Sequence, residues 1–276
     1  MAFHNYYKVF VPYCSSDIYV GDKEAEDANI DFHFRGYTIM EAVRRDLEQH
    51  VNLGEAANVI ISGGSAGGMG AMRHCDVWAR ALPRAGVKCI PDSGSFSPYN
   101  LAAAEEDCIG IGGDFDFAGT QEYWNASIPA ECYDQRPGSH EQKIKDCIMQ
   151  SIAYKYVQSP QFIATYKFDS FFAAQWCYPE CGEANRTSYH DRWDAAMNEI
   201  VNEVRTSYNH VGLFMPSCWG HVLNGRDDSY SQFTAGSEGL TYNQAVNNWM
   251  TGTGSRHAVD ECGALCNNNC GGDDCF

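Results

Sequence analysis

The segment at residues 61–70, ISGGSAGGMG, holds a serine in a pattern that serves nucleophilic catalysis. Gly63, Ser65 and Gly67 match G-x-S-x-G, and an apolar run at residues 57–61 precedes them. Between a strand and a helix, this pattern is typical of a nucleophile elbow, a sharp turn that lifts the serine hydroxyl above a sheet. The glycines permit strained backbone and a close approach of strand and helix. We predict that Ser65 is a nucleophile; the alternative is a tight glycine-rich connection without chemistry.

A serine nucleophile needs a histidine that takes its proton and a carboxylate that orients this histidine. In α/β-hydrolases the three groups follow in the order serine, acid, histidine, on loops after successive strands. Beyond Ser65, the ends of three expected strands bring Asp92, Asp169 and His221. His221 follows the last of these strands and is the predicted base. We prefer Asp169 as the acid because it lies two strands beyond the serine and one before the histidine. Asp92 remains the alternative acid, or a turn residue.

Other histidines and cysteines are weaker candidates. His74 lies in the helix expected after the elbow, and His190 and His210 flank another expected helix, so we assign these three structural roles. Cys75 and Cys218 could be nucleophiles, but in an oxidising compartment both are expected to form disulfides. The sequence contains neither the phosphate-binding pattern G-x-x-x-x-G-K-[ST] nor the zinc-binding pattern H-E-x-x-H. We therefore expect no metal and no cofactor.

Alternating strands and helices would position these residues in an α/β fold, a doubly wound and mostly parallel sheet with helices on both faces. The predicted strands are residues 7–11, 57–61, 87–90, 161–166 and 211–215. The predicted helices are residues 38–51, 67–82, 142–156, 188–208 and 240–250. Thr38 with Glu41, and Thr241 with Gln244, predict capping boxes at two helix starts. The glycine-rich residues 108–119 are predicted to form a loop.

The composition indicates a folded, secreted protein. Its 276 residues, 44% hydrophobic and 20% charged, suffice for one large α/β domain. The net charge of -17 opposes binding to nucleic acid or to an anionic membrane surface. No apolar run reaches the roughly 18 residues of a membrane span. Thirteen cysteines, with glycosylation sequons at Asn125 and Asn185, indicate a secreted, disulfide-bonded extracellular protein. We expect a monomer.

The two ends of the sequence differ from the rest. The first residues, MAFHNYYKVFVPYC, lack a signal-peptide pattern, so we expect the sequence to begin downstream of its natural start. We expect residues 1–258 to form one hydrolase-like domain and residues 259–276 a cysteine-rich tail. The four cysteines of the tail could bind a metal, but without C-x2-C pairs we expect two disulfides instead. These cysteines are Cys262, Cys266, Cys270 and Cys275. We also expect Cys132 to pair with Cys147.

Six segments are distinctive in combination: VFVPYCSSDIYVGD at 9–22, FRGYTIMEAVRRDL at 34–47, ISGGSAGGMGAMRHCD at 61–76, VKCIPDSGSF at 87–96, FDSFFAAQ at 168–175 and FMPSCWGH at 214–221. In this order they resemble the pectin acetylesterase family, which includes the animal Notum carboxylesterases. The resemblance implies an α/β-hydrolase fold, secretion, and hydrolysis of oxygen-linked esters. It also implies Ser65 as nucleophile, Asp169 as triad acid and His221 as base.

One departure from the family pattern concerns the oxyanion hole. Family members carry a G-G-G-W-C segment upstream, which implies further oxyanion N–H donors and a cysteine partner for the position of Cys14. This sequence does not contain that segment, so we expect only the Ala66 N–H as oxyanion donor and an unpaired Cys14. Losing one donor costs roughly 100- to 1,000-fold in rate, so weak activity is expected of the chain as it stands.

The resemblance implies two classes of acylated substrate. Plant and microbial members remove acetyl groups from cell-wall polysaccharides such as pectin, whereas Notum removes a long unsaturated (palmitoleoyl) group from a signalling protein. We prefer the acetylated polysaccharide, although like charges slow the encounter of an acidic enzyme with pectin. A deep apolar pocket would favour the acylated protein. A non-catalytic, glycan-binding homologue is the alternative of another class, and the presence of Ser65, Asp169 and His221 argues against it.

Overall fold

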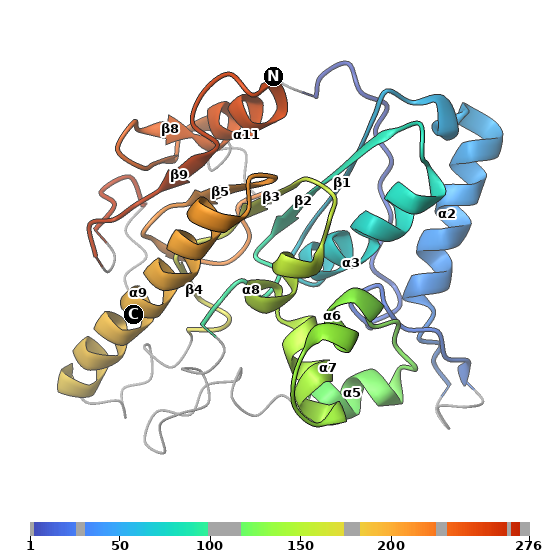
Figure 1. Cartoon of the computed structure of the whole chain (residues 1–276), viewed down its shortest axis with the longest axis horizontal. Helices are drawn as coiled ribbons and strands as arrows, with labels where there is room; N and C mark the ends of the chain where they lie inside the picture. Colours follow the sequence, from blue (N-terminus) through green and yellow to red (C-terminus); the bar gives the residue numbers. More distant parts are fainter. Residues whose placement is uncertain are drawn as a thin grey trace. The chain divides into compact units, whose positions relative to one another are not determined.

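The computed structural model describes residues 3–25, 31–98, 117–173, 183–224, 231–263 and 266–270. The chain folds as two compact units, and Figure 1 labels the larger helices and strands of both. Unit 1 comprises residues 1–4, 95–115 and 162–276, and unit 2 comprises residues 5–94 and 116–161. The predicted boundary between a domain at residues 1–258 and a tail at residues 259–276 is a different one from the boundaries of these two units, and it stays a prediction.

Unit 2 is built on two parallel strands, β1 (Asn58–Gly64) and β2 (Gly86–Asp92), paired in register from Asn58 opposite Gly86. Helix α3 (Ala66–Ala81) connects them, as a parallel pair requires. Helix α2 (Gly36–Val51) precedes β1. Apolar residues of these four elements form one buried cluster: Met40, Val59, Ile61, Ala71, Met72, Cys75, Trp78, Val87 and Cys89. The predicted strand–helix–strand order around the serine is therefore confirmed.

Helix α2 begins two residues before the predicted start, and the predicted capping box of Thr38 and Glu41 is wrong. The Gly36 N–H donates to the carboxylate of Asp17 at 2.7 Å, so a residue far upstream satisfies the first turn. Thr38 instead donates its hydroxyl to Asp22 at 2.5 Å. The buried Asp17 also accepts from the Ser15 hydroxyl and from two backbone N–H groups of its own loop. A cap from a remote residue is invisible to local sequence patterns.

The remainder of unit 2 is helical in short pieces. After the 3-10 helix η1 (Leu53–Glu55), these are α5 (Phe117–Tyr123), α6 (Ala130–Gln135), α7 (His140–Ile148), α8 (Gln150–Ala153) and the 3-10 helix η2 (Tyr154–Tyr156). The single predicted helix at 142–156 is wrong, because Met149 takes an extended ψ of 117° between α7 and α8. A disulfide joins Cys132 to Cys147, as predicted, and ties α6 to α7.

Unit 1 holds the later strands of the parallel sheet. Strand β3 (Gln161–Ala164) starts at the last residue of unit 2, and in unit 1 its neighbours follow in the order β5 (Val211–Met215), then β9 (His257–Val259). Strands β5 and β9 are parallel, with Leu213 opposite His257. Helices α9 (Glu183–Ser207) and α11 (Tyr242–Thr251) belong to the same unit. Strand β5 has the predicted bounds, whereas β9 was not predicted.

Small two-stranded pairings complete unit 1. Strands β4 (Phe168–Asp169) and β6 (Trp219–Gly220) are parallel, and β7 (Thr234–Ala235) and β8 (Leu240–Thr241) are antiparallel. The capping box of Thr241 and Gln244 is confirmed, and it starts α11 two residues later than predicted. Parallel strands with connecting helices confirm the predicted α/β class.

Two further predictions for irregular segments need correction. Residues 7–11 form no strand; Tyr7 is 97% and Phe10 88% exposed, and the Val11 carbonyl accepts from the Tyr19 hydroxyl rather than from a neighbouring strand. For the predicted loop at 108–119, residues 108–116 lie outside the described residues. Residues 117–119 form the start of helix α5, so this part of the loop prediction is wrong. Within the described ranges, no helix is both long and apolar enough to cross a membrane.

Candidate active site

Ser65 occupies a strained turn between β1, which ends at Gly64, and α3, which begins at Ala66. Its φ of 55° and ψ of -122° are unusual for a residue with a side chain. Such strain persists only where neighbouring contacts hold it. The Ser65 N–H donates to the Asp92 carbonyl at 2.9 Å, and the Ser65 carbonyl accepts from the N–H groups of Gly68 and Met69 at 2.8 and 3.1 Å. The predicted strand–turn–helix context of Ser65 is present.

Glycines around Ser65 allow three pieces of backbone to meet. A Cβ on Gly63 would lie 2.5 Å from the Gly67 carbonyl oxygen, and one on Gly68 would lie 2.4 Å from the Asp92 carbonyl oxygen. Both distances are too short for a side chain. By contrast, a Cβ on Gly67 would meet only the Tyr19 ring, at 3.9 Å. Gly68, which the G-x-S-x-G pattern does not include, is thus the glycine that lets α3 approach β2.

Asp92, the alternative acid, has a supporting place in unit 2. Its main-chain oxygen accepts the Ser65 N–H, and its buried carboxylate accepts the Ser93 hydroxyl at 3.0 Å. The backbone contact holds the elbow in its strained conformation. In the described structure Asp92 therefore contributes to the shape of the turn.

Asp169 and His221 meet in unit 1 because of strand pairing. Asp169 ends β4 and lies opposite Gly220 of β6, and the Ser170 N–H donates to the Gly220 carbonyl at 2.9 Å. His221 Nδ1 then lies 2.8 Å from Asp169 Oδ1 and 3.0 Å from Oδ2. Gly220 is required here, since a Cβ at this position would lie 2.9 Å from the ring of Tyr166.

Surrounding groups orient this acid–base pair. The Phe171 N–H donates to Asp169 Oδ1 at 2.9 Å, and the Phe171 ring stacks on the His221 ring with centroids 5.5 Å apart. The Asp169 side chain is 3% exposed and that of His221 is 23% exposed. With its Nδ1–H donated to a buried carboxylate, a neutral imidazole uses Nε2 to accept a proton. This arrangement suits a general base.

The predicted triad residues thus fall into two groups. Ser65 and its neighbour Ala66 belong to unit 2, whereas Asp169 and His221 belong to unit 1. The Ala66 N–H opens α3 and so has no partner within that helix, which suits an oxyanion donor. The structure describes a strand–turn–helix elbow in unit 2 and a hydrogen-bonded Asp169–His221 pair in unit 1.

Comparison with known proteins places these features in a family. The sequence model of the family described as Pectinacetylesterase matches residues 1–271. The chain belongs to the pectinacetylesterase family. It is therefore a member of a family of carboxylic ester hydrolases, and its mostly parallel sheet with helices agrees with the α/β-hydrolase-like fold of this family.

Curated relatives of this pectinacetylesterase family member fall into two groups. Pectin acetylesterase 11 of Arabidopsis thaliana is 28% identical over 298 residues, which cover 97% of this chain and 70% of that protein. Palmitoleoyl-protein carboxylesterase NOTUM of Schmidtea mediterranea is 28% identical over 231 residues, covering 80% of this chain and 42% of that protein. Palmitoleoyl-protein carboxylesterase NOTUM of Mus musculus is 28% identical over 227 residues, covering 78% of this chain and 42% of that protein. The match thus spans less than half the length of the Notum relatives.

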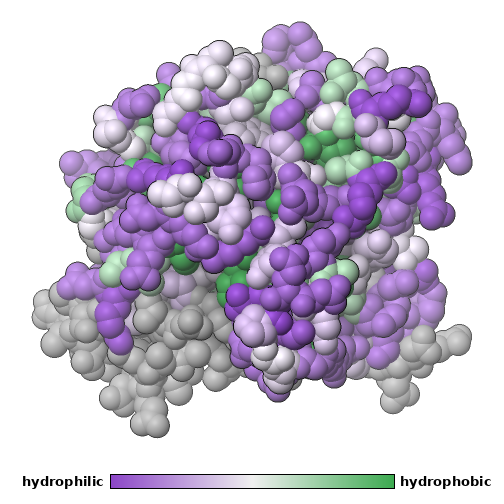
Figure 2. Space-filling model, viewed as in Figure 1, coloured by the Kyte–Doolittle hydropathy of each residue, from purple (hydrophilic) through white to green (hydrophobic). Residues whose placement is uncertain are grey.

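An apolar groove of about 890 Å³ runs along β1 in unit 2. Its wall includes the elbow from Gly63 to Gly67, with aliphatic and aromatic side chains of α2, α3 and residues 5–13. Figure 2 shows hydrophobic surface in the upper right, where Figure 1 draws β1 and α2, on a face that is otherwise mainly hydrophilic. Sequence reasoning missed this groove, because residues 7–11 were assigned to the sheet.

The remaining candidates have structural roles in the described residues. His74 is buried, its Nε2 donates to the Tyr19 carbonyl at 2.7 Å, and burial lowers its pKa to about 4. Asn125 is exposed, as a glycosylated asparagine must be, and Asn185 lies in α9. Neither glycosylation prediction is tested by these positions.

Cysteine pairing follows the sequence predictions except in the tail. Disulfides join Cys75 to Cys89 and Cys218 to Cys270, so neither Cys75 nor Cys218 is a nucleophile. Among the described residues Cys14 is the free cysteine, as predicted. The bridge Cys262–Cys266 lies within the tail, but the expectation that Cys270 also pairs there is wrong. Its partner lies 52 residues upstream, which spacing alone does not reveal. Cys275 lies outside the described residues.

Proposed function

We propose that this protein is a serine carboxylesterase with Ser65, His221 and Asp169 as its catalytic triad. In this reaction Ser65 attacks the ester carbonyl, His221 takes the serine proton and returns it to the leaving alcohol, and Asp169 stabilises the imidazolium. Water then releases the acyl group from Ser65 by the same proton path. The hydrogen-bonded Asp169–His221 pair is the observation that carries this proposal. The strained elbow and the Ala66 N–H support it.

As substrate we propose O-acetyl esters of cell-wall polysaccharide, such as pectin. The support is the extent of the comparison: pectin acetylesterases match 97% of this chain, whereas the Notum relatives match about four fifths of it. An acetyl group needs only a small space beside the serine, and the sugar chain binds to open surface. With a net charge of -17, the enzyme should act faster on acetylated xylan than on polyanionic pectin of equal acetyl content.

The second candidate is a long-chain O-acyl ester on a protein, and the apolar groove favours it. The groove adjoins Ser65 and offers aliphatic walls, which suit a fatty acyl chain better than an acetyl group. Each methylene buried there would contribute about 0.8 kcal/mol to binding. In this case kcat/KM should rise steeply with acyl length.

We further propose that the protein is secreted and monomeric. Four disulfides in the described residues would be reduced in a cytosol, so their presence supports an oxidising compartment. Sedimentation of the protein secreted from eukaryotic cells would test both statements. Finding the protein reduced inside the cell, or as a stable dimer, would contradict them.

The test of function is an ester series measured on matched variants. Release of acetate from acetylated xylan and pectin is compared with hydrolysis of aryl esters of two to sixteen carbons. Ser65→Ala should abolish hydrolysis. Ser62→Ala is the matched control, since Ser62 lies three residues earlier on β1 and its hydroxyl donates to the Ile90 carbonyl at 3.1 Å. Hydrolysis that survives Ser65→Ala would refute the esterase proposal; glycan binding without hydrolysis would point to the non-catalytic homologue.

A further inference from the structure

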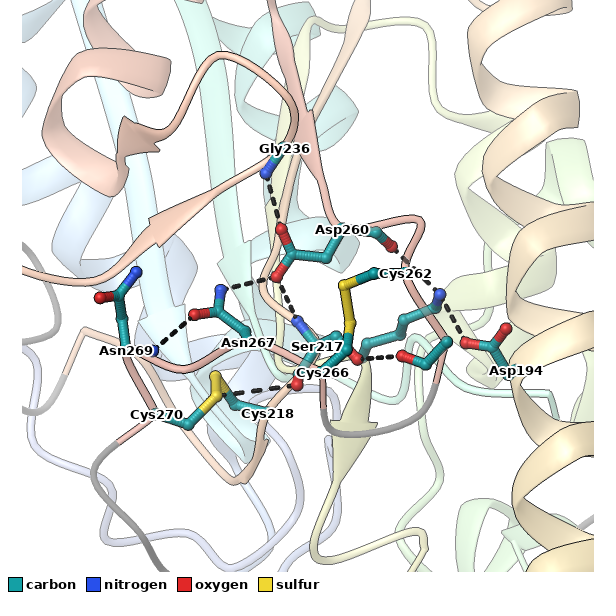
Figure 3. The surroundings of a disulfide bond; sticks show 12 residues. Asp194, Ser217, Cys218, Gly236, Asp260, Cys262, Cys266, Asn267, Asn269 and Cys270 are labelled. Atoms are coloured by element: carbon teal, nitrogen blue, oxygen red, sulfur yellow. Dashed lines mark hydrogen bonds and ion pairs between the residues drawn. A yellow bond between two sulfur atoms is a disulfide. The ribbon is translucent and has the colours of Figure 1, made fainter.

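Asp260 gathers three hydrogen-bond donors directly after β9 in unit 1 (Figure 3). Its Oδ1 accepts from the Gly236 N–H at 2.8 Å. Its Oδ2 accepts from the Ser217 N–H at 2.8 Å and from Asn267 Nδ2 at 2.6 Å. The donors come from three separate stretches of the chain. A carboxylate with this many donors keeps its side chain in one orientation.

The main-chain oxygen of Asp260 contacts Lys167, which directly precedes β4, the strand that carries the proposed acid. Lys167 Nζ donates to the Asp260 carbonyl at 3.1 Å and forms an ion pair with Asp194 Oδ1 of α9 at 2.6 Å. The Lys167 side chain is completely buried. A buried ammonium is tolerated only with such partners. Because Lys167 lies two residues before Asp169, its anchorage limits the movement of β4.

The loop that carries His221 is anchored to the same place. Four residues before His221, Ser217 gives its N–H to Asp260 and its hydroxyl to the Gly263 carbonyl at 2.6 Å. The next residue, Cys218, is bound to Cys270 by a disulfide (Figure 3). The Phe168 N–H then donates to the Cys218 carbonyl at 3.3 Å, alongside the β4–β6 pairing.

We infer that Asp260 and Lys167 are positioning residues for the proposed Asp169–His221 pair, an inference that rests on the proposed function. Asp260 contacts the segments that lead into both members of the pair, Lys167 on one side and Ser217 on the other. Its displacement would therefore move the carboxylate and the imidazole relative to each other. Displacements of about 1 Å at such a pair cost up to roughly 100-fold in rate.

Asp260→Asn in the full chain tests this inference. The amide keeps the volume of the carboxylate but offers one acceptor oxygen to three donors, so the Ser217 contact or the Gly236 contact must be lost. We expect kcat on an aryl acetate to fall roughly 10- to 100-fold with KM changed less than about twofold. We also expect the low-field proton resonance of His221 Nδ1–H to broaden through faster exchange with water.

Asn269→Ala is the matched control. Asn269 lies in the same tail, and its side-chain amide donates to the Thr234 hydroxyl at 2.9 Å rather than to the Asp260 carboxylate. This variant should keep the kcat and the His221 resonance of the natural sequence. Melting temperatures of both variants separate lost stability from lost positioning.

The outcomes distinguish the inference from the function on which it rests. If Asp260→Asn melts earlier but keeps both kcat and the resonance, Asp260 only stabilises the fold and the inference is overturned. If Ser65→Ala retains hydrolysis, the proposed function fails, while the resonance still reports on the pair. Should Asp260→Asn not fold, Asn267→Ala, which removes one of the three donors, takes its place. We then expect a several-fold lower kcat and faster exchange, and an unchanged kcat and resonance would reject the inference.

Discussion

His221 and Phe171 both donate to one oxygen of Asp169, the imidazole Nδ1–H at 2.8 Å and the backbone N–H at 2.9 Å. Two donors on Oδ1 fix the plane of the carboxylate, and the Phe171 ring then covers one face of the imidazole. The loop that follows β4 thus orients the carboxylate of the proposed acid and contacts the ring of the proposed base.

Asp169→Asn should lower kcat on the order of 10⁴-fold if the proposed triad is correct, because an amide donor facing Nδ1 favours the wrong histidine tautomer. The measurement is steady-state hydrolysis of an aryl acetate across neutral pH. Asp92→Asn is the control, since the Asp92 contact to Ser65 is made by its main-chain oxygen, which this substitution keeps. A larger loss of kcat in Asp92→Asn than in Asp169→Asn would reverse the assignment of the acid.

Gly68→Ala should destabilise the fold much more than Gly67→Ala. The new methyl group at position 68 would lie 2.4 Å from the Asp92 carbonyl oxygen, so α3 must move away from β2. We expect the melting temperature to fall by roughly 5 °C or more. Gly67→Ala has room and should be neutral or stabilising by up to about 1 kcal/mol through helix propensity. Equal melting temperatures for the two variants would show that the close approach of α3 and β2 is unimportant.

Acid should destabilise the protein partly through His74. Burial lowers its folded pKa from 6.5 to about 4, so below pH 6.5 the unfolded chain binds a proton that the folded chain rejects. Stability is therefore lost as the pH falls from 6.5 to 4, by about 3 kcal/mol for this group. Denaturant unfolding at several pH values measures this slope.

His74→Gln should flatten that slope, because the glutamine amide can still donate to the Tyr19 carbonyl without titrating. Burial together with Arg256 and Arg205 lowers the pKa of His257 to about 4 as well, so part of the slope should remain. If the unfolding free energy of His74→Gln changed with pH as steeply as that of the natural sequence, His74 would not be a source of the acid sensitivity.

Loss of the Cys75–Cys89 disulfide should destabilise unit 2, since this bond ties α3 to β2. The bridge closes a loop with a sequence separation of 14, and for such a loop the chain-entropy cost is about 3 kcal/mol. Chemical denaturation of Cys75→Ala/Cys89→Ala measures the loss. Cys262→Ser/Cys266→Ser, with a separation of only 4, should lose less. The reverse order of stability would contradict this prediction.

Local patterns predicted the parts of this protein that depend on near neighbours in the sequence. Strand β5 is a short apolar run between breakers, α11 starts at its own capping box, and Ser65 lies in a glycine-rich turn between strand and helix. Each of these signals is contained within about ten residues. The six ordered segments predicted the family, and the match of the family model to residues 1–271 confirms this prediction.

Tertiary structure alone decided the contacts between distant residues. Asp17 caps α2 from 19 residues away, Cys218 binds Cys270 at a separation of 52, and Lys167 contacts Asp260 across 93 residues. Residues 7–11 had a strand-like pattern but form no strand, because a strand also requires a partner for its backbone groups. Hydrogen bonds and disulfides at such separations depend on how the chain folds back on itself, and no periodicity in the sequence records that path.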